Sequence, residues 1–263
     1  MTTKKKSKKK TTKKSTNKKK SSKKSSSKKK TTKSTRLKSG IKGFDEICGG
    51  GIPRKSVSLI VGDSGSGKTI FSTQFLLGGL KNGEKCLFVT FEEKKDVFYK
   101  NMKKLGWDLK NYEEKKKFFF LEYSPEKVKT MIEEGGGEIE NIVMKHKVTR
   151  VVIDSITSFA LLFDDELQKR EAALSLFDII RRWKVTSFLT LQEKPSSRGR
   201  EPSSSLEFES DSIILLYFTR KDKKRRKRYL EVLKMRGTNH SKSIHSTKIL
   251  KDGFRVYKTS SKK

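Results

Sequence analysis

Short apolar runs alternate with longer amphipathic stretches along most of the chain. The apolar runs predict buried β-strands at residues 56–62, 86–91, 118–123, 148–153, 186–191 and 213–218. The stretches between them predict helices, of which the main ones cover residues 68–80, 96–105 and 164–183. The last of these has apolar residues at the spacing of one helix face, namely Ala173, Leu176, Phe177 and Ile180. Buried strands that alternate with helices indicate a mostly parallel sheet with helices on both faces.

The C-terminal part of the chain follows a different pattern. Its apolar segments are separated by turn residues, and they predict antiparallel strands at residues 228–235, 247–250 and 254–257. Asp252-Gly253 is typical of a hairpin turn between the last two strands. A helical stretch after residue 123 is interrupted by glycines at 135–137. The predicted fold class is therefore α/β, with a mostly parallel central sheet flanked by helices and with C-terminal antiparallel strands.

The N-terminal segment differs from the rest of the chain in composition. Residues 1–39 contain 19 basic residues and no acidic residue, in a protein of 263 residues with a formal net charge of +34. With almost no apolar side chains, this segment cannot bury enough surface to offset the entropy lost by an ordered chain. We therefore expect a disordered basic tail at residues 1–36 and one domain at residues 37–259. The tail predicts non-specific binding to nucleic acid or another polyanion, with solubility or a compositional bias of the host as the alternative.

The composition excludes several classes of protein. The longest wholly apolar run, residues 213–218, is far shorter than the roughly 20 residues that span a bilayer, so we expect no transmembrane segment. The basic N-terminus lacks the apolar stretch of a secretory signal. The two cysteines, Cys48 and Cys86, form no metal-binding or redox motif. These features predict a cytoplasmic protein, and the basic tail leaves association with a nucleoid open.

Residues 62–69 read Gly-Asp-Ser-Gly-Ser-Gly-Lys-Thr and satisfy the phosphate-loop motif between a predicted strand and a predicted helix. Glycines allow backbone N–H groups to turn toward phosphate oxygens at the positive end of a helix. Lys68 adds positive charge at the β- and γ-phosphates, and the Thr69 hydroxyl can ligate Mg²⁺. The predicted cofactors are ATP and Mg²⁺, and the predicted ATP-binding residues are Gly62, Asp63, Ser64, Gly65, Ser66, Gly67, Lys68, Thr69 and Ile70.

A carboxylate that can bind Mg²⁺ follows another predicted strand. Asp154 comes directly after the apolar residues of the strand at 148–153. A phosphate loop is commonly paired with such an acidic residue on a neighbouring strand, where it helps to hold the metal. Asp154 and Thr69 are therefore the predicted metal-binding residues, and the alternative is an aspartate that caps the next turn.

Three further polar residues follow strands at the same predicted edge of the sheet. Glu92 and Glu93 come directly after the strand at 86–91 and are predicted to be catalytic, since hydrolysis needs a group that orients or deprotonates water. A solvated acidic turn is the alternative for this pair. Gln192, just past the strand at 186–191, is a candidate sensor of the γ-phosphate.

GTP is the competing nucleotide. Residues 219–222, Thr-Arg-Lys-Asp, differ by one substitution from the T-K-x-D signature of guanine recognition. However, Arg220 stands in place of the stacking lysine, and no D-x-x-G follows Asp154. A basic hairpin loop is the favoured interpretation of this segment.

Several segments together resemble the KaiC family of RecA-type ATPases. The most specific is residues 233–240, Leu-Lys-Met-Arg-Gly-Thr-Asn-His, and the others are 62–69, 71–75, 88–93, 106–109, 152–157, 210–211 and 223–228. The resemblance covers about residues 37–257, essentially the whole predicted domain. It implies a RecA-like P-loop NTPase fold, one ATP at each subunit interface, and a homo-oligomeric ring that is usually hexameric.

The resemblance also implies roles for individual residues. Glu92 and Glu93 match the catalytic carboxylates of the family. In members of the family, certain residues reach the nucleotide that is bound by the neighbouring subunit. The residues of this chain at the matching positions are Lys234, Arg236, Thr238 and His240. A lysine and an arginine two positions apart on a strand point the same way and can neutralise charge on a transferring phosphoryl group, so Lys234 and Arg236 are predicted to be catalytic. Without the resemblance, a solvated strand face is the simpler interpretation of these two residues.

The chain departs from the clock protein of this family. It has one such domain, whereas the clock protein has two. Glu207 and Phe208 precede Ser210-Asp211, where the autophosphorylated domain has adjacent serine and threonine residues. We therefore expect neither autokinase activity at these positions nor a role in a circadian clock. Gln192 resembles the recombinase relatives instead.

The predicted function is Mg²⁺-dependent ATP binding and hydrolysis by a ring that acts in signalling or regulation. One alternative is a recombinase-like, DNA-dependent ATPase, for which Arg198, Gly199 and Arg200 supply a candidate DNA-binding loop. The other is an ATP-gated scaffold ring with negligible turnover. The protein partner and the downstream process are unknown at this level.

Overall fold

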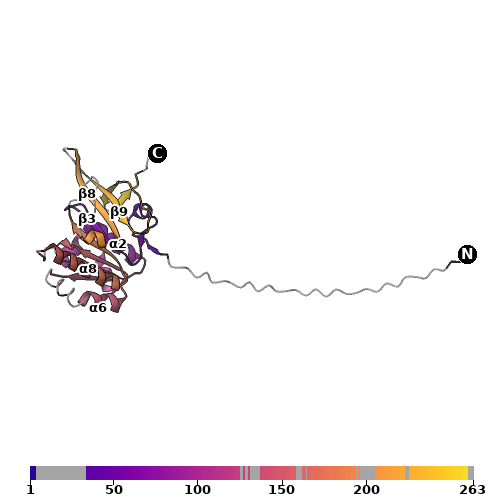
Figure 1. The fold of residues 1–263 in the computed structure, drawn as a ribbon, viewed down its shortest axis with the longest axis horizontal. Helices are drawn as coiled ribbons and strands as arrows, with labels where there is room; N and C mark the ends of the chain where they lie inside the picture. The colour runs from indigo at the N-terminus through magenta and orange to yellow at the C-terminus, as the bar shows by residue number, and fades with distance from the viewer. Residues whose placement is uncertain are drawn as a thin grey trace. The chain divides into compact units, whose positions relative to one another are not determined.

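The computed structural model describes residues 1–3, 34–124, 127, 130, 137–157, 162–163, 165–193, 195, 205–222 and 225–259. The chain divides into two units, Met1–Lys33 and Ser34–Lys263, and the second contains the fold described below (Figure 1). Residues 4–33 of the predicted tail lie outside the described residues, and so does the candidate DNA-binding loop at 198–200.

Among the described residues, nine strands form one sheet in the order β11-β10-β9-β8-β3-β7-β6-β4-β5. The parallel strands are β3 (Val57–Gly62), β4 (Cys86–Thr90), β5 (Phe118–Glu122), β6 (Arg150–Asp154), β7 (Thr186–Gln192) and β8 (Ser212–Asp222). The antiparallel strands are β9 (Arg225–Met235), β10 (His245–Leu250) and β11 (Gly253–Tyr257). This arrangement confirms the predicted fold class.

Helices cover both faces of the sheet and bury a hydrophobic core on each. Helices α6 (Gly137–His146) and α8 (Glu166–Arg182) pack on one face. Helices α2 (Lys68–Lys81) and α3 (Lys95–Lys104) pack on the other face. There the ring of Phe75 in α2 stacks on the ring of Phe188 in β7, with a distance of 4.0 Å between the ring centroids. None of the described helices is long and apolar enough to span a membrane.

Several element boundaries differ from the sequence prediction. The main helix of the second half begins at Glu166 because the Asp165 carboxylate accepts a hydrogen bond from the backbone N–H of Gln168, at 3.0 Å, and caps it. Short elements were missed, because they are too brief to show a periodic pattern: α1 (Phe44–Ile47), α4 (Leu109–Glu114), α9 (Ser205–Glu209), β1 (Arg36–Leu37) and β2 (Ile52–Pro53). Strands β8 and β9 are longer than predicted, because their charged ends pair with each other beyond the apolar segment.

The parallel strands align their carboxyl ends at one edge of the sheet. Gly62, the last residue of β3, is in register with Gln192 of β7. Thr90, the last residue of β4, is in register with Asp154 of β6. Since the loops that follow these strands leave from the same edge, the phosphate loop, Glu92, Asp154 and Gln192 gather there.

Candidate functional site

The loop between β3 and α2 is shaped by its glycines. Gly65 and Gly67 have φ angles of +75° and +104°, which side chains other than glycine rarely adopt. A Cβ atom at Gly67 would lie 2.9 Å from Cδ1 of Ile249, and one at Gly62 would lie 2.7 Å from the carbonyl oxygen of Leu216. The glycines therefore keep a concave backbone at the N-terminus of α2, where the helix dipole and free N–H groups favour an anion.

The side chain of Lys68 is hydrogen-bonded to the backbone of this loop. Its ammonium group donates hydrogen bonds to the carbonyl oxygens of Gly62, at 2.9 Å, and Asp63, at 3.2 Å. Burial lowers the pKa of Lys68, while the negative charges of Asp154 and Glu92 act in the opposite direction. The positive charge of Lys68 is therefore held at the floor of the loop, facing two carboxylates.

Asp154 and Thr69, the two predicted metal ligands, meet at the edge of the sheet. The Thr190 hydroxyl donates a hydrogen bond to Oδ1 of Asp154, and the Thr69 hydroxyl lies near enough to this carboxylate to lower its pKa. Burial raises the pKa of Asp154, and the hydroxyls of Thr190 and Thr69 oppose that effect. The structure thus brings together one hydroxyl and one carboxylate oxygen donor.

This donor set fits Mg²⁺ in a nucleotide complex. Within the described part of the chain, no group of three or more His, Cys, Asp or Glu residues is arranged to hold a metal ion by itself. Mg²⁺ is usually held by one or two carboxylates together with waters and substrate phosphates. Thr69 and Asp154 would supply the protein's share of such a shell beside the phosphate-binding loop.

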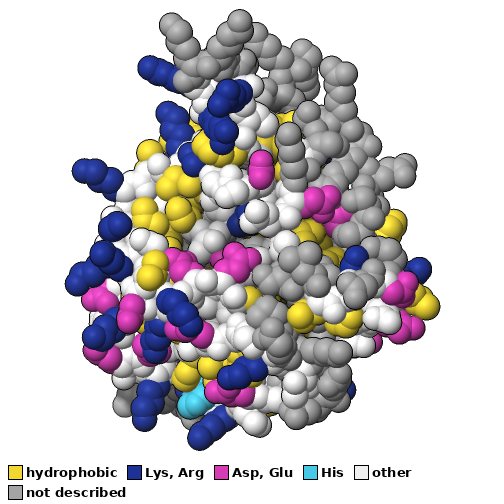
Figure 2. Space-filling view, turned by 90° about the vertical axis from the view of Figure 1, so that its left-hand side faces the viewer, with side chains coloured by type: hydrophobic (Ala, Val, Ile, Leu, Met, Phe, Trp, Pro, Cys, Tyr) yellow, Lys and Arg dark blue, Asp and Glu magenta, His cyan; other side chains and the backbone are white. Residues whose placement is uncertain are grey.

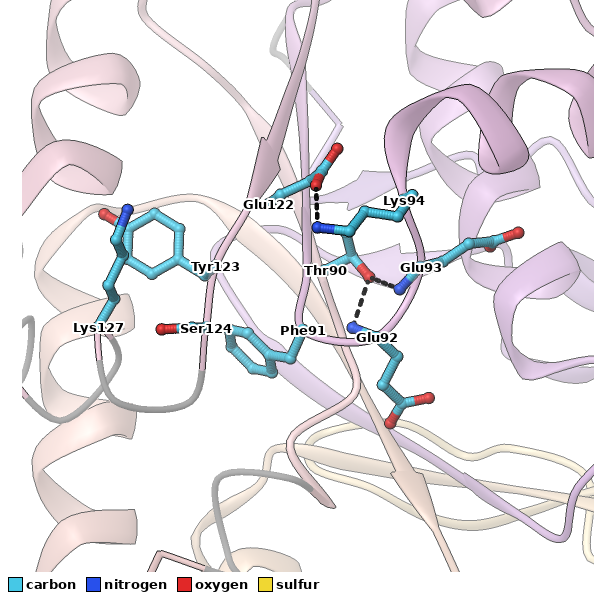
Figure 3. Close-up of a pocket in the computed structure, with 9 residues that line it drawn as sticks. All are labelled: Thr90, Phe91, Glu92, Glu93, Lys94, Glu122, Tyr123, Ser124 and Lys127. Carbon is cyan, nitrogen blue, oxygen red and sulfur yellow. Dashed lines mark hydrogen bonds and ion pairs between the residues drawn. The ribbon is translucent and has the colours of Figure 1, made fainter.

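The two glutamates after β4 are held by different partners (Figure 3). The Thr90 hydroxyl accepts hydrogen bonds from the backbone N–H groups of both Glu92 and Glu93, at 3.2 and 3.1 Å, which orders the turn. Oε1 of Glu92 accepts a hydrogen bond from the Ser155 hydroxyl at 2.5 Å. Oε1 of Glu93 accepts one from Nδ2 of Asn101 at 2.9 Å, and burial raises the pKa of Glu93.

A cavity of about 420 Å³ lies between these groups. Its lining includes the predicted residues Ser64, Gly65, Gly67, Lys68, Thr69, Ile70, Glu92, Asp154 and Gln192. Glu93 instead lines a separate cavity of about 340 Å³ beside β5, to which Glu92 also contributes (Figure 3). The structure thus brings one of the two predicted catalytic carboxylates to the phosphate loop.

Arg228 is a residue of this cavity that the sequence did not single out. Its guanidinium donates hydrogen bonds from Nε and Nη2 to the carbonyl oxygen of Gly65, at 3.2 and 2.9 Å, and lies 4.1 Å from the ring centroid of Phe218. Burial lowers the pKa of Arg228. In the sequence it is the last of a run of basic residues, and only the pairing of β8 with β9 places it beside the phosphate loop.

Lys234 and Arg236 lie at the opposite edge of the sheet. Lys234 donates hydrogen bonds to the carbonyl oxygens of Glu207, at 3.2 Å, and Phe208, at 3.0 Å. Arg236 donates one to the same Phe208 oxygen at 3.1 Å and pairs with the Asp211 carboxylate at 3.4 Å. Strand β9 ends at Met235, so Arg236 lies just beyond it, yet both cations converge on the C-terminal end of α9.

Thr238 and His240 lie in the segment that follows β9. The Thr238 hydroxyl accepts a hydrogen bond of 2.5 Å from Nη2 of Arg36, at the start of the described domain. Nδ1 of His240 lies 3.0 Å from the carbonyl oxygen of Ser241. Neither residue lines the cavity at the phosphate loop, so the predicted site residues form two separate groups within one chain.

Comparison with known proteins finds consistent matches. A family model described as "ATPase: KaiC" matches residues 37–261. The circadian clock protein KaiC3 of Synechocystis sp. is 35% identical over 214 residues, which are 79% of this chain and 42% of that protein. The circadian clock oscillator protein KaiC of Synechococcus elongatus is 34% identical over 233 residues, which are 84% of this chain and 44% of that protein. The chain therefore spans less than half the length of these relatives.

One solved structure matches over nearly its full length. The KaiC-like protein PH0186 of Pyrococcus horikoshii OT3 superposes with a TM-score of 0.75 and 34% sequence identity. The match covers 85% of this chain and 99% of that one. The likeness therefore extends over a whole single-domain protein as well as over part of the longer relatives.

Proposed function

This chain belongs to the KaiC family of RecA-type ATPases, and on that basis we propose that it binds ATP with Mg²⁺ and hydrolyses it in the cavity at the phosphate loop. The observation that carries the proposal is the convergence of Lys68, Thr69, Asp154 and Glu92 on one cavity of about 420 Å³. These side chains come from three different segments of the sheet edge, and together they supply the groups that phosphoryl transfer to water requires.

The binding roles follow from the geometry. The backbone of the loop and the N-terminus of α2 hold the phosphates, and Lys68 exchanges its bonds to Gly62 and Asp63 for phosphate oxygens. Thr69 and Asp154 would hold Mg²⁺, which would neutralise charge on the phosphates. Arg228 stabilises the loop through its hydrogen bond to the carbonyl oxygen of Gly65, and its positive charge lies beside the proposed nucleotide site.

The hydrolytic roles fall on the polar residues that face the phosphate loop. Glu92 orients and deprotonates the attacking water, and the hydroxyl of Ser155 holds its carboxylate in place. Gln192 lines the same cavity and is the proposed sensor of the γ-phosphate. Glu93 is proposed as a second catalytic carboxylate because it matches a catalytic position of the family. Its contribution to the rate of hydrolysis is expected to be smaller than that of Glu92, because its carboxylate is bonded to Asn101.

The second group of predicted residues supports hydrolysis between subunits. Strand β3 spans Val57–Gly62, so at about 3.3 Å per residue its ends lie roughly 16 Å apart. Arg236 is tied to the far end, since its N–H bonds to Asp211, whose own N–H bonds to Val57. Arg236 is therefore out of reach of the phosphate loop in its own chain.

We infer that each subunit offers this edge to the next one in a ring, which the family likeness suggests is hexameric. The residues that would reach the neighbour's nucleotide are Lys234, Arg236, Thr238 and His240. A role of the ring in signalling or regulation is the proposed context. A circadian clock is not, because Glu207 and Phe208 stand where the autophosphorylated domain has serine and threonine.

The test is ATP turnover by the full chain with Mg²⁺ and with EDTA, combined with native mass measurement in ATP and in ADP. We expect Mg²⁺-dependent turnover and a ring in ATP. A ring without turnover would favour the scaffold alternative, and turnover that requires DNA would favour the recombinase-like one. Absence of nucleotide binding at millimolar ATP would contradict the proposal.

A further inference from the structure

Strands β8 and β9 continue beyond the sheet as a two-stranded ribbon (Figure 1). β8 pairs with β3 only as far as Leu216, and β9 pairs with β10 only from Arg228 onward. Beyond these points the two strands pair with each other alone, with Thr219 opposite Lys227 and Arg220 opposite Arg226. We call residues 219–222 and 225–228, the described parts of the two strands, the basic hairpin.

The basic hairpin is the most densely charged part of the described domain. Its described residues 220–222 and 225–228 are six basic residues and one acidic residue. The side chains of Arg220, Arg225, Arg226 and Lys227 are exposed, and none of the four forms an ion pair with another side chain that the structure describes. Like charges placed this closely repel one another, so an external anion would stabilise the hairpin.

A cavity at the base of the hairpin is lined by cations. It measures about 510 Å³ and lies between β9 and β10, where Arg226, Lys227, Arg228 and Lys248 line it; no carboxylate of a residue that the structure describes lines it. Figure 2 shows several Lys and Arg side chains on the upper part of this face, toward the end at which β8 and β9 project in Figure 1, and others lower on the same face. Guanidinium groups match phosphate oxygens in a bidentate geometry, and lysines add point charge.

We propose that the basic hairpin and Lys248 bind the phosphate backbone of double-stranded nucleic acid, as a site distinct from the N-terminal tail. A two-stranded ribbon fits the major groove of a duplex, and contacts to its phosphates need no particular sequence. An acidic protein is the less suitable partner, because no large apolar side chain is exposed within the described residues of the hairpin to anchor a protein interface.

The hairpin also contacts the phosphate loop. The guanidinium groups of Arg226 and Arg228 both lie over the ring of Phe218, at 5.1 and 4.1 Å from its centroid, and Arg228 donates a hydrogen bond to the carbonyl oxygen of Gly65. A duplex that engages Arg226 therefore acts on residues that support the loop. This coupling rests on the proposed nucleotide site, whereas the binding of nucleic acid does not.

The test is the salt dependence of binding to a labelled duplex, measured by fluorescence anisotropy with the full chain, in EDTA and without nucleotide. The test variant carries Arg225→Gln, Arg226→Gln and Lys227→Gln. Each lost phosphate contact lowers the slope of log affinity against log salt by about 0.9, so we expect a decrease of about 2 to 3. The matched control removes the same charge from the exposed face of α3, with Lys100→Gln, Lys103→Gln and Lys104→Gln, and should leave the slope unchanged.

Two outcomes would overturn the proposal. Equal slopes for the test variant, the control and the parent would assign all binding to other parts of the chain, the tail above all. Displacement of the duplex by polyglutamate at the same charge concentration would show that the hairpin recognises charge alone. Circular dichroism of both variants establishes that they are folded, and because nucleotide is absent, a failure of the proposed ATPase function leaves this result unaffected.

Discussion

Glu92 and Glu93 are adjacent in the sequence, yet their carboxylates are held on different sides of the turn that follows β4. The Ser155 hydroxyl donates to Oε1 of Glu92 at 2.5 Å, whereas Nδ2 of Asn101 donates to Oε1 of Glu93 at 2.9 Å. Of the two glutamates, the one that lines the cavity with Lys68 is Glu92. Their roles are therefore separable by single substitutions.

Glu92→Gln should slow ATP turnover by about 10²-fold or more and leave ATP bound, because it removes the group that activates water. Glu93→Gln should slow turnover less, since its carboxylate faces Asn101. The measurement is kcat with saturating Mg²⁺ and ATP, together with the affinity for a fluorescent ATP analogue. A larger loss for Glu93→Gln, or parent turnover when both are replaced, would contradict the assignment.

Lys68→Ala should abolish productive ATP binding, because the phosphates lose the cation held at the floor of the loop. Asp154→Asn should instead raise the Mg²⁺ concentration needed for half-maximal turnover, with little effect on folding. Isothermal calorimetry and a Mg²⁺ titration of turnover measure the two effects. Lys81→Ala, an exposed lysine at the other end of α2, is the matched control and should behave as the parent.

Arg236→Ala should inactivate the ring while each subunit still binds ATP, because the residue acts on the neighbour's nucleotide. Mixed with Lys68→Ala subunits, it should regain partial activity at interfaces that join an intact loop to an intact Arg236. Turnover of the mixture and native mass spectrometry of the mixed rings are the measurements. No recovery in rings that contain both variants would leave Arg236 as a support for α9 through its bond to Phe208.

Stability should fall as the pH is lowered, in part through His245. This side chain is buried, and its Nδ1 accepts a hydrogen bond of 3.0 Å from the N–H of Thr259, while Nε2 lies 2.8 Å from the Ser241 hydroxyl. Burial, with the charge of Lys258, lowers the pKa of His245 below its ordinary value of 6.5. The unfolded chain therefore takes up the proton at a higher pH than the folded one, and the contribution present above pH 6.5 is lost as pH falls through the folded pKa.

The check is urea unfolding at about pH 7.5 and about pH 5.5, for the parent and for His245→Gln. The difference in unfolding free energy between the two conditions should shrink in the variant. His240→Gln, which replaces a histidine that is only partly buried, should keep the parent's difference. An identical pH dependence in all three proteins would exclude His245 as a contributor.

Glu84→Gln should destabilise the fold by about 3 kcal/mol, because it leaves the buried cation of Arg150 without its counter-charge. Arg150 is fully buried, and its Nη2 and Nε donate to the two Glu84 oxygens at 2.7 and 2.9 Å. The control is Glu113→Gln, which breaks the more exposed pair with Lys95 and should cost less than about 1 kcal/mol. Equal losses in urea unfolding would mean that burial of the Arg150 pair does not matter.

The sequence determined those features that depend on local spacing. Apolar runs predict buried strands because a strand that is buried on both faces needs apolar side chains throughout. The alternation of these strands with helices predicts that the strands run parallel in the sheet. The phosphate loop can also be recognised from local spacing, since its glycines, Lys68 and Thr69 are close together in the sequence. Asp154 could be singled out as a candidate because the end of a strand is visible in the sequence as the end of an apolar run.

Only the tertiary structure decided which side chains share a cavity. The split between Glu92 and Glu93 depends on Ser155 and Asn101, and the place of Arg228 depends on the pairing of β8 with β9. The separation of Arg236 from its own phosphate loop follows from the length of β3. Periodic patterns record whether a residue is buried, but they carry no information about which distant segment buries it, because that choice is made by the packing of the whole sheet.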